Sequence, residues 1–268
     1  MKLALCTIQR DRGPWLKEWF AFHHLMGVDK FYFFAHKCTD NTEQVIDELK
    51  HHFDITAFKL ADDLATPQLM AYKFAYENFG HECDWMAFID GDEFLFPTAD
   101  TDIKSVLEKF WYQKISALAV YWACFGSSGH VQEPAGLITE NYRMRAPLEF
   151  LENRHIKSIV MGRQNASFQI LSNSHRFGTA LGTFDEKLRP ISGGRTEYEP
   201  SYDLLRINHY CTQSYEYFKK FKQGSGAADV NPNLIRPDTW WTTYDHNEVR
   251  DESLIHIAPK LKALVDTL

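Results

Sequence analysis

The sequence lacks the features that mark several large classes of protein. No apolar run approaches the length of a membrane span. No basic stretch is present and the net charge is −7, which disfavours a nucleic-acid role because phosphates would not be neutralised. The five cysteines are scattered without metal-site spacing, which indicates reduced thiols in a cytosolic protein. The N-terminal residues carry too short an apolar core for a signal peptide.

Repeats, linkers and low-complexity segments are also missing, so we expect residues 1–268 to form a single domain. The composition is globular, with 44% hydrophobic and 15% aromatic residues. Strand and helix patterns alternate over the first hundred residues. Strands are expected at 3–8, 30–34, 55–60 and 85–89, and helices at about 15–26, 42–51 and 68–79. Short connections and right-handed crossovers then predict an α/β, Rossmann-like, mostly parallel central sheet flanked by helices.

The second half of the chain has a less regular pattern. We expect strands at 116–124, 156–160 and 204–208, and helices at 102–110, 143–154, 214–223 and after Pro259. Residues 162–203 are polar, glycine-rich and irregular. We expect this region to be mobile and to act as a loop that orders when a ligand binds and shields it from water; an ordinary surface excursion is the alternative.

One acidic turn stands at the centre of the functional prediction. Trp85 to Ile89 is an apolar run of strand length, and Asp90, Asp92 and Glu93 follow it directly. Carboxylates at the carboxyl end of a buried parallel strand lie where open α/β sheets bind ligands. Two acids one residue apart repel unless a cation neutralises them, and hard oxygen ligands suit Mg²⁺ or Mn²⁺, which also hold phosphate oxygens.

The order of further motifs resembles glycosyltransferase family 92 and the related family 2-like group of GT-A-fold glycosyltransferases, across roughly residues 3–226. The matching pieces are Arg10-Asp11-x-Gly13-Pro14, Glu18-Trp19, His24-x-x-Gly27-Val28, Cys38-Thr39-Asp40-Asn41-Thr42, Asp84-Trp85, Asp90-Gly91-Asp92-Glu93-Phe94, Phe125-Gly126-Ser127-Ser128-Gly129-His130, Lys157-Ser158, Asn208-His209-Tyr210, Ser214, Lys220 and Gly224. Arg12 stands where the family usually carries an acid, and His36-Lys37 where an Asn-rich turn is usual.

The resemblance implies a metal-dependent hexosyltransferase with a nucleotide-sugar donor, a UDP-hexose. Asp92 would bind Mn²⁺ or Mg²⁺ directly, Asp90 would hold the metal through water or bind the ribose, and His209 would be a metal ligand. The metal would stabilise the charge that develops on the leaving diphosphate. The other donor-binding positions implied are Arg10, Asp11, Asp40, Lys157 and Lys220, with Lys222 a second candidate for the diphosphate.

The same resemblance divides the chain into a nucleotide-sugar-binding half, 1–125, and an acceptor-side half with a C-terminal extension, 126–268. The acceptor would be a saccharide or glycolipid in bacterial surface polysaccharide or lipopolysaccharide synthesis, with the protein in the cytoplasm or peripheral at the inner face of the membrane. An inverting reaction needs a base. The candidates are His130, Glu133, Asp185 and Glu186. His130 and Glu133 are preferred because they follow the Gly126–Gly129 loop, which in this fold class lies beside the acceptor, and spacing does not choose between these two.

Three other functions are compatible with parts of this pattern. The acidic turn differs by one residue from the Gly-Gly-Asp-Glu-Phe signature of diguanylate cyclases. Haloacid-dehalogenase phosphatases also carry Asp-x-Asp after a strand, although Phe94 stands where Thr or Val is usual. An inactive carbohydrate-binding protein would keep the fold, and the intact acids and His209 disfavour it.

Overall fold

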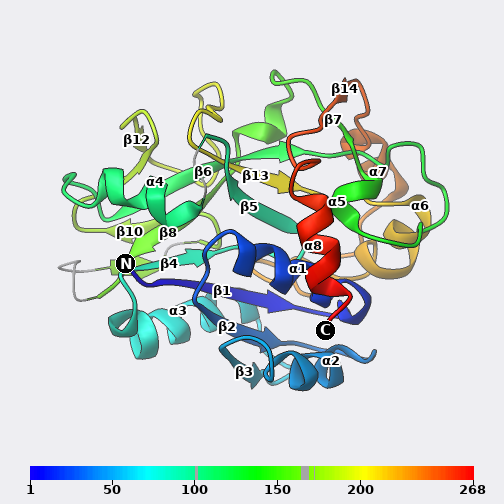
Figure 1. Cartoon of the computed structure of the whole chain (residues 1–268), viewed down its shortest axis with the longest axis horizontal. Helices are drawn as coiled ribbons and strands as arrows, with labels where there is room; N and C mark the ends of the chain where they lie inside the picture. Colours follow the sequence, from blue (N-terminus) through cyan, green and yellow to red (C-terminus); the bar gives the residue numbers. More distant parts are fainter. Residues whose placement is uncertain (100–101, 164–168, 172) are drawn as a thin grey trace.

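The computed structural model describes residues 1–99, 102–163, 169–171 and 173–268. The first hundred residues form the predicted alternation of strands and helices (Figure 1). In chain order these elements are β1 (Leu3–Gln9), α1 (Gly13–Leu25), β2 (Lys30–Ala35), α2 (Thr42–Leu49), β3 (Ile55–Lys59), α3 (Pro67–Phe79), the 3₁₀ turn η1 (Gly80–Glu82), β4 (Trp85–Phe88) and β5 (Glu93–Pro97).

The second half adds short helices and further strands. They are α4 (Ile103–Phe110), β6 (Ala117–Cys124), α5 (Ile138–Asn141), β7 (Met144–Arg145), the 3₁₀ turn η2 (Leu151–Arg154), β8 (Ile156–Met161), β9 (Gln169–Leu171), β10 (Phe177–Thr179), β11 (Thr183–Asp185), β12 (Pro190–Ile191), β13 (Leu205–His209), α6 (Tyr215–Tyr217), the π-helical turn η3 (Phe218–Lys222), α7 (Asp238–Tyr244), β14 (Val249–Arg250) and α8 (Ala258–Val265). None of the helices in the described part of the chain has the length and apolar character needed to cross a bilayer.

The central sheet is largely parallel, which confirms the predicted fold class. Among the described residues its strand order is β12-β11-β6-β8-β4-β1-β2-β3, and β13 pairs with both β6 and β5. Strands β1 to β4, β6, β11 and β13 all run in one direction, whereas β5, β8 and β12 are antiparallel to their neighbours. The carboxyl ends of β1, β2, β4, β6 and β13 therefore meet at one edge of the sheet.

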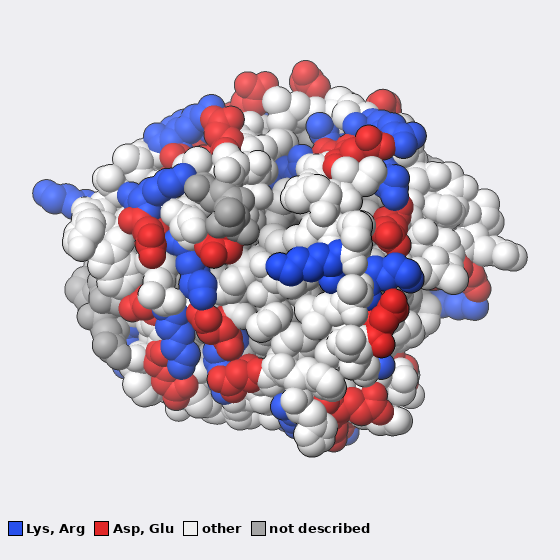
Figure 2. All heavy atoms as spheres, viewed as in Figure 1, with Lys and Arg blue, Asp and Glu red and all other residues white. Residues whose placement is uncertain are grey.

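Helices cover both faces of this sheet. Alternate residues of a strand point to opposite faces, and here both faces are apolar, so the strands read as continuous hydrophobic runs. Leu3 and Phe31 pack with residues of α1, α2, α4 and α8 on one face. Ala4 and Tyr32 pack with α3 on the other. Over the face seen in Figure 2, acidic and basic side chains are interspersed.

One local prediction is wrong, and one strand was not predicted. Residues 143–154 are not a helix: β7 pairs with β14, and η2 is a single short turn. Pro147 disfavours helical conformation in the residue before it, and the buried Asn153 side chain instead accepts the N–H of Cys124 and donates to the carbonyl of Pro147. The strand that was not predicted is β5, which pairs antiparallel with β13.

The region 162–203 contains β9 to β12, and its residues 164–168 and 172 lie outside the described residues. The predicted ordering of this region on ligand binding is not tested by the structure of a single state. It stays a prediction.

A buried ion network attaches the C-terminal segment to β13. Both Asp251 carboxylate oxygens accept from the Arg206 guanidinium, each at 3.0 Å, and Arg145 Nε donates to Oδ2 at 2.7 Å. The side chains of Asp251 and Arg206 are each only 7% exposed. Burial alone would raise the pKa of Asp251, but the Arg206 guanidinium holds that pKa below its usual value.

We predict that Asp251→Ala lowers the free energy of unfolding by about 3–5 kcal/mol, because it leaves two arginines buried without their partner. Denaturant titration measures the change. The exposed neighbour Glu252, paired with Arg250 at 2.6 Å, provides the control, and Glu252→Ala should change stability by at most about 1 kcal/mol.

The Asp251 contribution should also depend on pH. Its folded pKa is depressed, so the stabilisation is present above the unfolded pKa of about 3.9 and is lost as the pH falls through the folded pKa. Equal acid sensitivity of the wild type and Asp251→Ala would contradict this assignment.

Candidate nucleotide-sugar site

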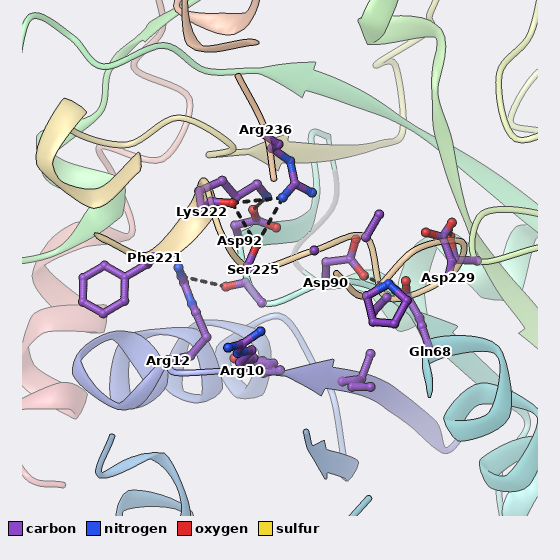
Figure 3. A pocket seen from close by; sticks show the side chains of 18 of the residues that line it. Arg10, Arg12, Gln68, Asp90, Asp92, Phe221, Lys222, Ser225, Asp229 and Arg236 are labelled. Carbon is purple, nitrogen blue, oxygen red and sulfur yellow. Dashed lines mark hydrogen bonds and ion pairs between the residues drawn. The ribbon is translucent and has the colours of Figure 1, made fainter. Parts of the chain in front are cut away.

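A cavity of about 290 Å³ lies at the edge where the parallel strands end. The ends of β1, β2, β4, β6 and β13 contribute Gln9, His36, Asp90, Trp122 and His209 to its lining. The opposite wall comes from the C-terminal part of the chain. It comprises Tyr217, Phe221, Lys222, the loop from Ser225 to Pro232, Arg236, Trp240 and Tyr244 (Figure 3).

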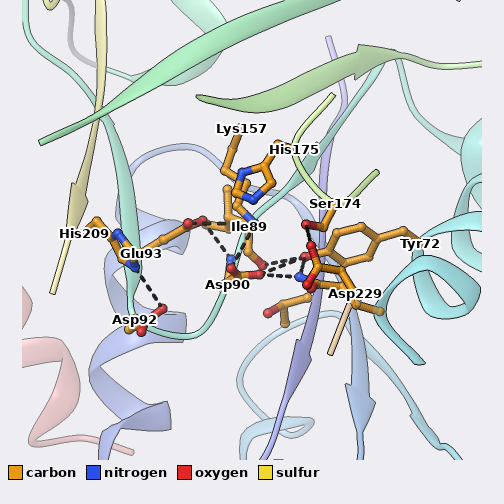
Figure 4. A network of polar contacts seen from close by, with 12 residues as sticks. Tyr72, Ile89, Asp90, Asp92, Glu93, Lys157, Ser174, His175, His209 and Asp229 are labelled. Carbon is orange, nitrogen blue, oxygen red and sulfur yellow. Dashed lines mark hydrogen bonds and ion pairs between the residues drawn. The ribbon is translucent and has the colours of Figure 1, made fainter. Parts of the chain in front are cut away.

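Asp90 is held by donors on three sides. Its Oδ2 accepts from Lys157 Nζ at 2.9 Å, and its Oδ1 accepts from Gln68 Nε2 at 2.6 Å and from the Tyr72 hydroxyl at 3.2 Å (Figure 4). Lys157 is 1% exposed. Burial would raise the pKa of Asp90, but the Lys157 ammonium holds that pKa below its usual value. Asp90 and Lys157 therefore form an ion pair in which the lysine is buried and the Asp90 side chain is 32% exposed.

Glu93 belongs to the same acidic turn and is fully buried. Its Oε2 accepts the backbone N–H of Asp90 at 2.8 Å, which closes the turn. Its Oε1 is buried without a hydrogen-bond partner, 3.8 Å from Lys157 Nζ. Burial raises the pKa of Glu93 well above its usual value. Burial thus favours the neutral form of Glu93, whose carboxyl group closes the acidic turn.

Asp92 lines the cavity, and its two carboxylate oxygens face different partners. One accepts from Lys222 Nζ, and the other lies 3.7 Å from His209 Nε2. Burial would raise the pKa of Asp92, but Lys222, His209 and Arg12 together lower it below its usual value. Burial lowers the pKa of His209 to about 3, so the imidazole is neutral and available as a ligand. Only 6% of the surface of Asp92 is exposed, so this residue is buried although it lies in an acidic turn.

Arg12, in the loop after β1, hydrogen-bonds to the acidic turn. Its guanidinium donates to the Gly91 carbonyl at 2.9 Å and to the Tyr217 hydroxyl at 2.6 Å. A Cβ atom at position 91 would come within 2.5 Å of the Gln9 side chain, so any larger residue there would require that side chain to move. The arginine that departs from the family pattern thus links the turn to the C-terminal wall.

Several predicted site residues lie away from the cavity lining. Asp11 has a positive φ of 50° and accepts the Thr39 N–H at 2.6 Å. Asp40 accepts the first N–H groups of α1 and α2, from Gly13 at 3.0 Å and Thr42 at 2.9 Å. Both carboxylates thus connect the loops after β1 and β2. Arg10 does line the cavity.

Of the two lysines predicted to bind the diphosphate, Lys222 lines the cavity and Lys220 does not. Lys220 lies on the exposed side of η3 and pairs with Glu216 at 2.5 Å, whereas Lys222 points to Asp92. The wide π-helical turn Phe218–Lys222 determines which lysine faces inward. Spacing alone could not have shown this.

The candidate bases have structural partners outside the cavity lining. Glu133 accepts from the Tyr142 and Ser214 hydroxyls, at 2.8 and 2.6 Å, and His130 Nε2 lies 3.3 Å from the Asn141 carbonyl oxygen. Asp185 pairs with Arg189 at 2.7 Å. Glu186 accepts the N–H groups of residues 203–205.

Sequence reasoning missed the side chains that the C-terminal loop and α3 bring to the cavity. Asp229 hydrogen-bonds the Ser174 hydroxyl at 2.7 Å, and the Ala228 carbonyl accepts the Gln68 N–H at 3.1 Å. Arg236 donates to the Lys222 carbonyl at 2.9 Å, and its guanidinium lies 5.5 Å from the Trp240 ring centroid. These residues follow no strand and match no motif, so the sequence held no signal for them beyond their chemical type.

A divalent cation fits one part of this arrangement. The described residues contain no group of three His, Cys, Asp or Glu side chains placed to hold a metal. Asp92 and His209 nevertheless converge, and His209 Nδ1 is buried without a hydrogen-bond partner. Two protein ligands suit Mg²⁺ or Mn²⁺, which keep waters and phosphate oxygens in their remaining positions. Asp90 fits less well, because Lys157, Gln68 and Tyr72 already satisfy its oxygens.

An open, largely parallel sheet with charged side chains and a cavity at its carboxyl edge defines a ligand-binding α/β protein of the nucleotide-binding type. Sequence comparison gives the family. The pattern of glycosyltransferase family 92 matches residues 2–243, and the chain belongs to this family.

The most similar curated relatives include plant members of the same family. A family 92 protein of Oryza sativa subsp. japonica is 25% identical over 265 residues, covering 89% of this chain and 41% of the relative. One from Ricinus communis is 26% identical over 278 residues, covering 94% and 46%. The chain therefore spans less than half the length of these relatives.

Solved structures show weaker similarity. The crystal structure of S. aureus TarS 1–349 has a TM-score of 0.40 at 11% identity, covering 61% of this chain and 48% of that one. The Mycobacterium tuberculosis glucosyl-3-phosphoglycerate synthase, in complex with Mn²⁺, UDP-glucose and phosphoglyceric acid, has a TM-score of 0.30 at 11% identity, covering 45% and 44%. The assignment to family 92 rests on the sequence comparison.

The charge states of the two neighbouring carboxyl groups can be tested with matched variants. Glu93→Gln resembles the neutral form, so we predict a change in unfolding free energy of about 1 kcal/mol or less. Asp90→Asn leaves Lys157 buried without its partner and should cost about 3–5 kcal/mol. Urea unfolding at pH 7 measures both. A larger loss for Glu93→Gln than for Asp90→Asn would mean that the ionised group is Glu93.

Proposed function

We propose that this protein is a metal-dependent hexosyltransferase that transfers a sugar from a UDP-linked donor to a saccharide or glycolipid acceptor. The observation that carries the proposal is the composition of the cavity in a family 92 chain. Asp92 and His209 face each other beside Lys222, Arg236, Arg12 and Arg10. Cations at this edge suit a diphosphate, and the carboxylate and imidazole suit its divalent partner.

Each part of the cavity has a role in this proposal. Asp92 and His209 would hold Mg²⁺ or Mn²⁺, which supplies charge stabilisation for the leaving diphosphate. Lys222 and Arg236 would hold phosphate oxygens. The ends of β1 and β2, with Gln9 and His36, lie where the nucleoside is expected in an open α/β sheet. The Nε2 of His36 and the Oε1 of Gln9 are buried without hydrogen-bond partners, as expected of groups that bind a ligand.

The acceptor side is proposed to be the aromatic wall. Trp122 lines the cavity, but its ring is packed between His209 and His155, with ring centroids 4.1 and 4.9 Å away. Trp240 and Tyr244, which stack at 4.4 Å between ring centroids, are only partly buried. Such partly exposed rings present the apolar surface that a sugar ring contacts. Asp229 supplies a carboxylate in the cavity, and it becomes the candidate base if the reaction inverts the anomeric centre. A cytoplasmic location and a place in bacterial surface polysaccharide synthesis remain proposals.

The first test concerns the metal and Asp92. We predict that EDTA abolishes UDP release from UDP-hexose and acceptor, and that Mn²⁺ restores it better than Ca²⁺, because an imidazole ligand suits Mn²⁺. Asp92→Asn should lower turnover at least about 100-fold, whereas Lys220→Met should leave it unchanged. Assays of UDP release across a panel of UDP-sugars measure these effects.

Full activity in EDTA would refute metal dependence. Release of phosphate from phosphomonoesters would favour the phosphatase hypothesis, and cyclisation of GTP would favour the cyclase hypothesis. UDP-sugar binding with no turnover for any acceptor or water would support the inactive carbohydrate-binding alternative.

A second test concerns closure over the donor. Ser174 and Asp229 connect the 162–203 region to the C-terminal loop at the cavity. We predict that UDP with Mn²⁺ slows amide hydrogen exchange at residues 173–176 and 225–236, because ligand contacts order segments that shield the anomeric carbon from water. Residues 42–49 of α2, which do not line the cavity, serve as the internal control. Unchanged exchange at both segments would contradict the lid.

A further inference from the structure

Lys222 and Asp92 form a contact that affects how a cation can bind. Lys222 ends η3, and its ammonium group donates to the Asp92 carboxylate; the two side chains are 16% and 8% exposed. The second Asp92 oxygen faces His209 Nε2 at 3.7 Å. The lysine therefore occupies the same carboxylate that would hold a divalent cation.

A monovalent and a divalent cation at one carboxylate repel each other, and this repulsion is strong where solvent is scarce. A divalent cation that binds Asp92 therefore favours displacement of Lys222 from the same carboxylate. The protein offers Lys222 no obvious alternative partner among the described residues that line the cavity. Asp90 is already paired with Lys157, and Asp229 lies on the far side of Asp90 from Lys222, bonded to Ser174 (Figure 3).

A diphosphate supplies the missing negative charge. Arg236 donates to the Lys222 carbonyl and lies at the same wall, so an anion bound there would be contacted by both residues. A lysine is a compact charge on a flexible stem and can follow the anion over a short distance. The ammonium would then leave Asp92 without losing a partner.

We propose that Lys222 blocks the metal position on Asp92 in the free protein and moves to the donor diphosphate when it binds, so that nucleoside diphosphate and divalent cation bind interdependently. This inference rests on the proposed function. Linkage makes the effect reciprocal: the diphosphate raises the affinity for the cation by the same factor that the cation raises the affinity for the diphosphate. Donor and metal would thus enter together.

The chain supplies a matched control two residues away. Lys220 is 62% exposed and pairs with Glu216 on the outer face of the same turn. Lys220→Met removes the same charge from the same element without touching Asp92. Any effect specific to Lys222 is therefore one of position and not of net charge.

The experiment measures Mn²⁺ binding by the loss of the free-ion electron paramagnetic resonance signal, without nucleotide and with UDP, and measures UDP binding in EDTA by calorimetry. We expect Lys222→Met to bind Mn²⁺ alone at least about tenfold more tightly than the wild type, within the usual range of coupling factors. The same variant should bind UDP in EDTA at least about tenfold more weakly. Lys220→Met should match the wild type in both.

Lys222→Gln keeps a hydrogen-bond donor and tests the same point if Lys222→Met does not fold. Mn²⁺ affinities of both variants equal to that of the wild type, with UDP and Mn²⁺ binding the wild type together, would overturn the exchange and leave the proposed function standing. A wild type that binds neither UDP nor Mn²⁺, separately or together, would overturn the proposed function and the exchange with it.

Discussion

Two lysine–carboxylate pairs, each with one buried member, determine the arrangement of the sheet edge where the parallel strands end. Lys157 on β8 neutralises Asp90, and Lys222 on η3 neutralises Asp92. Burying a charged group without its partner would be strongly unfavourable, so the buried Lys157 and the buried Asp92 each require the other member of the pair. The lysines come from segments far apart in the chain: Lys157 joins β8 to the acidic turn, and Lys222 joins the C-terminal wall to it. Asp90, Asp92 and Lys222 all line the cavity.

The elements from β1 to β4 were predictable because local patterns determine them, whereas β5 depends on its pairing with the distant β13. Continuous apolar runs separated by amphipathic helices indicate a parallel sheet, and the position of Asp90 and Asp92 after β4 follows from that topology alone. For these residues the order of strands and helices along the chain was enough to predict their place in the fold. The family resemblance alone implied that His209 and Asp92 would share a site, and the structure brings them together through the parallel pairing of β13 with β6.

The rest depended on contacts between distant segments. Lys222 instead of Lys220 faces Asp92 because of a π-helical turn that residue spacing does not reveal. Asp11 and Asp40 carry the residue types of a nucleotide site, yet they bind backbone N–H groups of neighbouring loops. Arg236 and Asp229 reach the cavity from a loop whose path is set by Gln68 and Ser174. Chemical type identified the candidates, and only the fold distinguished ligand-facing groups from loop anchors.

The central claim is that this cavity binds a nucleoside diphosphate and a divalent cation at Asp92 and His209. The most direct measurement is a crystal structure of the protein with UDP and Mn²⁺, with data collected at the manganese absorption edge. The account predicts an anomalous peak between Asp92 and His209, with the diphosphate against Lys222 and Arg236. A diphosphate bound elsewhere, or a manganese peak away from Asp92 with the Lys222–Asp92 pair intact, would contradict it.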